Sequence, residues 1–106
     1  AASSLRTAPL AILVTGRHRN SDVWREDASA AAAFILLEAV EMGLGACWVQ
    51  IFQRPCGAET SEEAVRRILG IDPDLSILCA IAVGYPAEEK EPRNLETLDR
   101  SRTHHL

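Results

Sequence analysis

Several hallmarks of other protein classes are missing from this chain of 106 residues. No apolar run reaches the ~18–20 residues that a transmembrane helix needs, so we expect no membrane partner. Acidic residues sit among the 11 basic ones and give a net charge of −4, which argues against a nucleic-acid partner. What is present, 47% hydrophobic and 25% charged residues, is the composition of one small globular domain.

Cysteine is scarce and unpatterned. Cys47, Cys56 and Cys79 form no C-x-x-C pair and no set spaced with histidines for a metal, so no metal site is predicted. Cys47 and Cys79 lie in apolar runs and are expected to be small buried hydrophobes, whereas Cys56 in a loop is the candidate for a reactive thiol. An odd count without a disulfide framework fits a reducing compartment, so we expect a cytoplasmic location.

Methionine is nearly absent as well. The sequence starts Ala-Ala-Ser-Ser without an initiator, and Met42 is its only methionine. We therefore expect either a processed N-terminus or a piece of a longer protein, in which case a targeting signal would lie outside these residues.

Hydrophobic patterning predicts five elements. Short apolar runs at 8–15, 45–51 and 76–86 read as strands covered on both faces. Between them, helices are expected from about Val23 or Asp27 to Met42 and over 60–69. The charged tail from Ala87 is expected to be irregular. The alternation of strands and helices predicts an α/β (α+β) layered domain.

Turn and cap residues mark the ends of these helices. Gly43 fits the left-handed position after the first helix, and Thr60 with Glu63 has the spacing of a capping box. The polar loop before the first helix offers three N-cap candidates: Asn20, Ser21 and Asp22.

The first helix is apolar on nearly every side. Only Glu38 and Glu41 mark a polar strip in its second half, so it should be buried in the domain or against a partner. Both faces of the three predicted strands also need to be covered. The chain has only two predicted helices, which are too few to bury the strands and the first helix as well. We therefore expect either a homodimer or a missing N-terminal segment.

Common catalytic signatures are absent. There is no P-loop and no Gly-x-Ser-x-Gly elbow, and Gly43-Leu-Gly45 lacks the third glycine of a dinucleotide fingerprint. The two glycines could be helix punctuation, or Gly45 could let the backbone pass close to a flat ligand. From residue chemistry alone, both possibilities stay open.

Three stretches in order resemble the FMN-dependent nitroreductase family: "DASAAAAFILLEAVEMGLGACWVQIF", "EEAVRRILGID" and "ILCAIAVGYPAEEKEPR". The tail "LDRSRTHHL" is similar to the family's D-E-S-R-V-H-Y ending, although this chain reads "HHL" where the family often has an aromatic after the histidine. The resemblance implies a three-layer α-β-α nitroreductase-like sandwich, incomplete here, with residues 1–106 as the C-terminal portion of a single domain. The family's R-x-S-x-R phosphate motif should precede Ala1 and does not occur in this chain.

The resemblance also implies a cofactor and its contacts. FMN lies at a dimer interface in this family, and NAD(P)H serves as co-substrate for reduction of a nitroaromatic, a quinone or a similar small-molecule acceptor. Carried over, Trp48, Val49, Gln50 and Ile51 line one side of the isoalloxazine, largely through main-chain groups. No side chain here looks like an obligatory catalytic group. The alternative is that 48–51 is a plain buried strand.

Arginines of the tail are candidates for the FMN phosphate, because a guanidinium binds a phosphate dianion in bidentate fashion. They are Arg93 and Arg102, with Arg100 between them. The alternative is that they are solvated. Likewise, two other readings of the whole chain remain: a non-catalytic association module that has lost flavin binding, and half of a flavodoxin-like fold.

Overall fold

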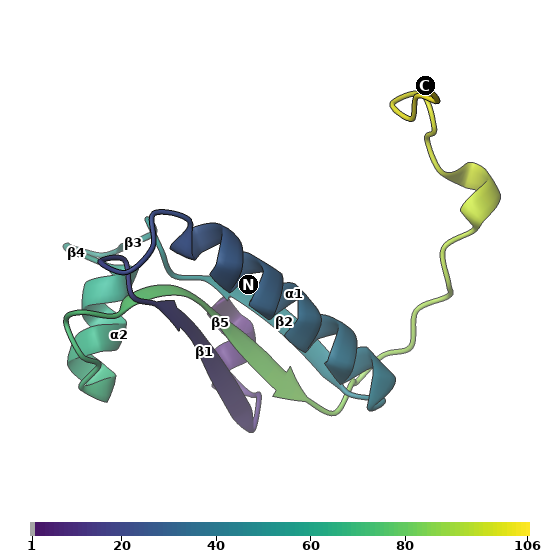
Figure 1. Cartoon of the computed structure of the whole chain (residues 1–106). Coiled ribbons are helices and arrows are strands. Elements are labelled where there is room, and N and C mark those ends of the chain that lie inside the picture. The colour runs from purple at the N-terminus through teal and green to yellow at the C-terminus, as the bar shows by residue number, and fades with distance from the viewer. Residues whose placement is uncertain (1) are drawn as a thin grey trace.

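The computed structural model describes residues 2–106 (Figure 1). Its centre is a three-stranded sheet in the order β1-β5-β2, in which both neighbouring pairs are antiparallel. These strands are β1 (Leu10–Gly16), β2 (Gly45–Gln50) and β5 (Ser76–Gly84). The three predicted strands are confirmed to within two residues at each end. The flavodoxin-like alternative is wrong, because that fold needs parallel neighbours.

Strand β5 is the middle of the sheet, and its sequence explains why. The seven residues from Ile77 to Val83 are all buried. Ala80 pairs with Leu13 of β1 on one side and with Val49 of β2 on the other. A run with no polar alternation can be accommodated only where both faces of the strand are covered.

Helix α1 (Trp24–Glu41) covers one face of the sheet, as Figure 1 shows. Four of its side chains are buried: Trp24, Ala28, Ala32 and Ala39. Small alanines at helical spacing let the helix axis approach the strands closely, and the larger residues of the sheet fill the space between them. This side of the core also contains Val14, Leu78, Cys79, Ile81 and Val83.

The opposite face carries a smaller core formed by α2 (Ser61–Leu69) and the 3-10 helix η1 (Ala2–Arg6). Leu5 and Val65 of these helices pack against a buried cluster of sheet residues: Val49, Ile51, Ile77 and Ala80. A two-stranded ribbon precedes α2, formed by β3 (Pro55–Cys56) and β4 (Glu59–Thr60).

Helix ends follow the predicted signals in two of three cases. Gly43 has a φ of 72°, and it and Leu44 donate backbone hydrogen bonds to Val40 and Ala39, which is the Schellman pattern. The capping box of α2 is complete, because the Thr60 hydroxyl and the Glu63 carboxylate each accept a hydrogen bond from the other's backbone N–H.

The N-cap prediction for α1 is wrong. Val23 occupies that position without a side-chain hydrogen bond. The Ser21 hydroxyl instead accepts from the Val23 N–H, so it closes a turn before the helix begins.

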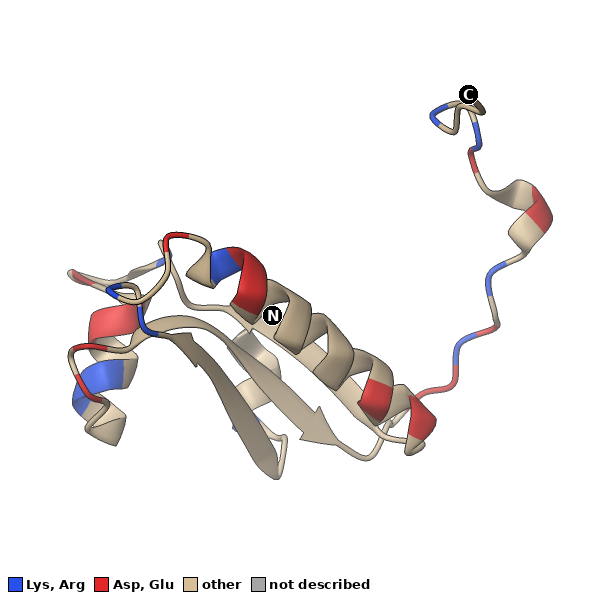
Figure 2. Ribbon diagram, in the orientation of Figure 1, with Lys and Arg blue, Asp and Glu red and all other residues tan. Residues whose placement is uncertain are grey.

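The outer side of α1 is not covered within residues 2–106. Phe34, Leu37 and Val40 are exposed by 71%, 65% and 73%. No charged residue lies between Asp27 and Glu38, so the middle of the helix is tan in Figure 2. The expectation that apolar residues of this helix exceed what the chain itself can bury is therefore confirmed.

From Ala87 the chain leaves the sheet and extends away from the body (Figure 1). Residues 87–106 are exposed, and their one regular element is the 3-10 helix η2 (Leu95–Thr97). None of the helices formed by residues 2–106 has the length and apolarity required to cross a bilayer.

Candidate functional site

The outer edge of β2 carries four of the predicted cofactor residues. Within residues 2–106, β2 has one neighbouring strand, β5. The Ile51 N–H donates to the Leu78 carbonyl at 3.0 Å, on the side of β5. Backbone groups alternate in direction along an antiparallel pair, so the peptide N–H and C=O of Gln50 and Trp48 face the open edge.

Side chains of this strand divide between the two faces of the sheet. Val49 and Ile51 are 4% and 5% exposed and belong to the core below α2. Trp48 and Gln50 are half-buried on the α1 side. The side chains of Val49 and Ile51 thus belong to the core, whereas the peptide groups of Trp48 and Gln50 face an edge that has no neighbouring strand among residues 2–106.

Hydrogen bonds connect three residues on the α1 side of β2 and the loop after it. The indole Nε1–H of Trp48 donates to Oε1 of Gln50 at 2.9 Å. Nε2 of Gln50 donates to the Phe52 carbonyl oxygen at 3.3 Å. Gln50, the polar exception in an apolar run, thus finds partners within its own segment, as a partly buried amide must.

An aromatic contact ties this edge to the start of α1. The Phe52 ring meets Trp24 edge to face with centroids 5.1 Å apart, and the Arg25 guanidinium lies 5.9 Å from the Phe52 centroid. Sequence reasoning did not single out these three residues. The sequence did carry one signal for Phe52. Side chains two residues apart on a strand lie on the same face, so Phe52 is expected on the face of Trp48 and Gln50.

The predicted phosphate arginines lie elsewhere. Arg93 and Arg102 are exposed in the extended tail, which Figure 1 shows directed away from β2. The structure therefore brings Trp48, Val49, Gln50 and Ile51 together and leaves both arginines apart from them.

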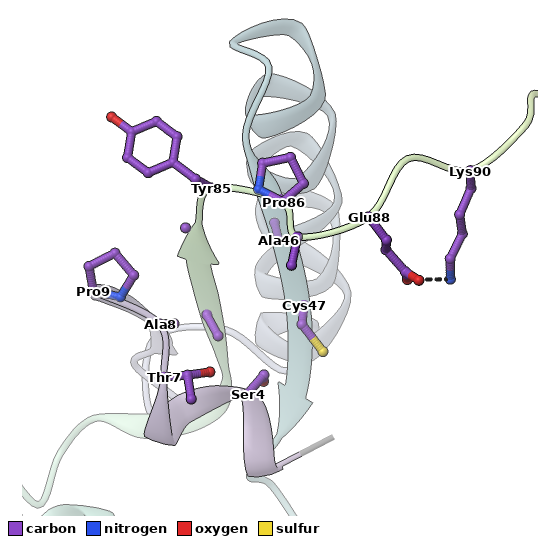
Figure 3. A pocket seen from close by; sticks show the side chains of 14 residues that line it. Ser4, Thr7, Ala8, Pro9, Ala46, Cys47, Tyr85, Pro86, Glu88 and Lys90 are labelled. Carbon is purple, nitrogen blue, oxygen red and sulfur yellow. Dashed lines mark ion pairs between the residues drawn. The ribbon is translucent and has the colours of Figure 1, made fainter.

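An open hollow of about 810 Å³ lies at the other end of β2 (Figure 3). The floor of the hollow consists of small residues, among them Gly45, Cys47, Ala82 and Gly84. The Ser4 and Thr7 hydroxyls of the N-terminal segment and the Glu88–Lys90 ion pair at 3.2 Å complete the rim. None of the six predicted cofactor residues lines this hollow.

The position of Gly45 and Cys47 beside the hollow explains how each is surrounded. A Cβ on Gly45 would meet Pro86 at 3.5 Å, an ordinary contact, and its φ is not left-handed. The protein itself therefore does not require a glycine there.

Cys47 is half-buried because its edge strand borders the hollow, so its assignment as a buried hydrophobe is wrong. Cys79 is fully buried, and burial raises the pKa of its thiol to about 11.

The profile of one protein family matches residues 1–85, and its description is "Nitroreductase family". The chain belongs to the nitroreductase family. The matched residues include β2 and its whole sheet, and end at Tyr85, so the tail with Arg93 and Arg102 lies beyond them.

Two curated archaeal relatives carry the name of a candidate NADH dehydrogenase/NAD(P)H nitroreductase. The one from Archaeoglobus fulgidus is 36% identical over 70 residues, which are 66% of this chain and 38% of that protein. The one from Methanothermobacter thermautotrophicus is 33% identical over 99 residues, 91% of this chain and 50% of that protein. The chain thus spans half or less of the length of these relatives.

Solved nitroreductases share the fold. An FMN-dependent nitroreductase from Clostridium difficile aligns with a TM-score of 0.89 and 39% identity, over 95% of this chain and 59% of that one. A candidate nitroreductase from Desulfovibrio desulfuricans, solved in complex with FMN, aligns with a TM-score of 0.61 and 29% identity, over 87% and 54%. The chain is therefore a mixed α/β structure that matches nitroreductases over part of their length.

Proposed function

We propose that this chain contributes one wall of an FMN site in an oxidoreductase that uses NAD(P)H. The observation that carries the proposal is the open edge of β2 in a member of the nitroreductase family, with outward-facing peptide groups at Trp48 and Gln50. Bound FMN would supply the redox chemistry, by accepting a hydride from NAD(P)H and passing two electrons to a nitroaromatic, a quinone or a similar acceptor.

The donor set at this edge fits the ring of a flavin. A heteroaromatic ring presents acceptor oxygens and nitrogens at its rim, and the edge offers backbone N–H donors whose positions the sheet fixes. Val49 and Ile51 anchor the strand in the core from the other face. In this proposal the chain binds and orients the ring mainly through its backbone, and no side chain acts as an acid or base.

The phosphate of FMN requires a positively charged partner, for which a guanidinium is well suited. Arg93 and Arg102 fit that chemistry, yet they extend away from their own sheet. We therefore propose that they act on the site of a second copy. A homodimer would also cover the exposed apolar side of α1, and the complete domain would form a three-layer α-β-α sandwich.

Flavin content and turnover test the function directly. The natural polypeptide that contains residues 1–106 should bind FMN in about a 1:1 ratio and oxidise NADH or NADPH faster when a nitroaromatic is added. A preparation that binds no FMN at micromolar concentrations would refute the proposal and favour an association module without flavin. If the protein binds FMN but does not oxidise NADH or NADPH, the FMN site stands and the assignment of NAD(P)H as co-substrate is wrong.

Oligomeric state tests the dimer. Leu37→Glu places a charge on the exposed apolar side of α1 and should convert the dimer to a monomer in sedimentation. Ile68→Glu is the matched control, since Ile68 is equally exposed, at 68%, but lies on α2. A wild-type monomer, or equal effects of the two variants, would contradict the assignment of α1 to the interface.

A further inference from the structure

The carboxamide of Gln50 is held at both ends by groups of opposite character. Its oxygen accepts from the Trp48 indole at 2.9 Å, and its nitrogen donates to the Phe52 carbonyl at 3.3 Å. An indole N–H can only donate and a backbone carbonyl can only accept. A flipped amide would place donor against donor and acceptor against acceptor, so the surroundings define one orientation.

One hydrogen-bond donor remains after these contacts are made. A carboxamide nitrogen carries two N–H groups, and one of them is used by Phe52. Within residues 2–106, no acceptor is found for the other. Because the amide cannot flip, this N–H keeps one direction relative to β2. The Gln50 side chain is half-buried on the α1 face of this edge strand.

The anchor at Phe52 is itself held in place. Its ring meets Trp24 at a centroid distance of 5.1 Å, nearly perpendicular, and the Arg25 guanidinium lies 5.9 Å from its centroid. Trp48 packs against the core between α1 and the sheet. Both partners of the carboxamide therefore lie on parts of the structure that are fixed by packing, which is what an oriented donor requires.

We propose that Trp48 is a positioning residue for Gln50, whose oriented carboxamide N–H donates to an acceptor oxygen or nitrogen of the flavin ring. The inference rests on the proposed function, in which this edge contacts FMN. It assigns the Gln50 side chain a contact of its own, beside that of its peptide group, and it gives the Trp48 indole a role exerted through Gln50.

The hydrogen bond between the two side chains is tested first, without any flavin. In the wild-type protein, the indole N–H proton of Trp48 should exchange slowly with solvent. In Gln50→Met, which keeps length and removes the amide, exchange should accelerate at least tenfold while the melting temperature changes little. Gln53→Met is the matched control, because Gln53 is an exposed glutamine in the next loop. Unchanged exchange in Gln50→Met would overturn the proposal.

A double-mutant cycle on FMN affinity tests the positioning role. Gln50→Met should raise the Kd for FMN about fivefold, the effect of one lost hydrogen bond. Trp48→Phe should raise it by about two- to fivefold in the wild-type background, and by less than twofold when Gln50→Met is already present. A merely structural role of Trp48 would give additive effects in the cycle. Such additivity would overturn the proposal.

The remaining outcomes separate this inference from the proposed function. No FMN binding by the wild-type protein refutes the proposed function and this inference with it. Normal FMN binding with unchanged Kd in both single variants refutes the inference alone, as does an effect confined to the KM of the electron acceptor. If Trp48→Phe fails to fold, Gln50→Glu serves instead, since a carboxylate accepts from Trp48 but cannot donate. Its FMN Kd should rise as in Gln50→Met, and an unchanged Kd would overturn the proposal.

Discussion

The two glycines that bracket Leu44 should respond differently to the same substitution. Gly43 has a φ of 72°, and a Cβ built there finds nothing within 4 Å. The cost of Gly43→Ala is therefore conformational and not steric, about 1 kcal/mol for an L-residue in the left-handed region. For a domain of this size, that loss corresponds to a fall of roughly 4 °C in melting temperature.

Gly45→Ala is the control for that experiment. Gly45 has no left-handed φ, and its Cβ would contact Pro86 at 3.5 Å, a normal van der Waals distance. Thermal melts followed by circular dichroism should show the Gly45→Ala protein within about 1 °C of wild type. Gly43→Asn should recover part of the loss, because asparagine tolerates this region. Equal melting temperatures for Gly43→Ala and wild type would refute the reasoning about the end of α1.

Three further predictions concern packing, capping and thiol chemistry. Gly84→Ala should destabilise the protein by roughly 1–3 kcal/mol in urea unfolding, since its Cβ would lie 2.9 Å from Pro9 Cδ. Thr60→Ala should cost about 1 kcal/mol. The Thr60 backbone N–H lowers the pKa of Glu63 below 4.5, so wild-type stability from this contact should fade as pH drops from 4.5 through the lowered value. Cys79, with its pKa near 11, should resist thiol reagents at pH 8 until the protein unfolds.

Local signals explain why much of the fold was predictable. The capping box needs only the spacing of Thr60 and Glu63, and the end of α1 needs only a glycine able to adopt a positive φ. Strand β5 was recognisable because burial on both faces leaves no polar residue in it. The antiparallel order was not accessible in this way, because it depends on which strands meet in space.

The site was only partly predictable, for a physical reason. Periodicity identifies a strand over Trp48–Gln50 but does not show which of its two edges is open. The open edge is known only once β5 is seen to pair with the other edge. The hydrogen bonds of the Gln50 carboxamide required the side-chain positions of Trp48 and Phe52. Arg93 was chosen by charge, and charge alone says nothing about where an extended tail places a guanidinium.

The central claim, that FMN binds at the open edge of β2, is tested most directly by amide chemical shifts in 15N-labelled protein during FMN titration. The account predicts the largest shifts at Trp48 and Gln50, whose peptide groups face outward. The outer edge of β1 (Leu10–Gly16) is the internal control, since among residues 2–106 it is also open. Saturable binding of FMN with shifts concentrated on β1, or on the hollow around Gly84, would contradict the account.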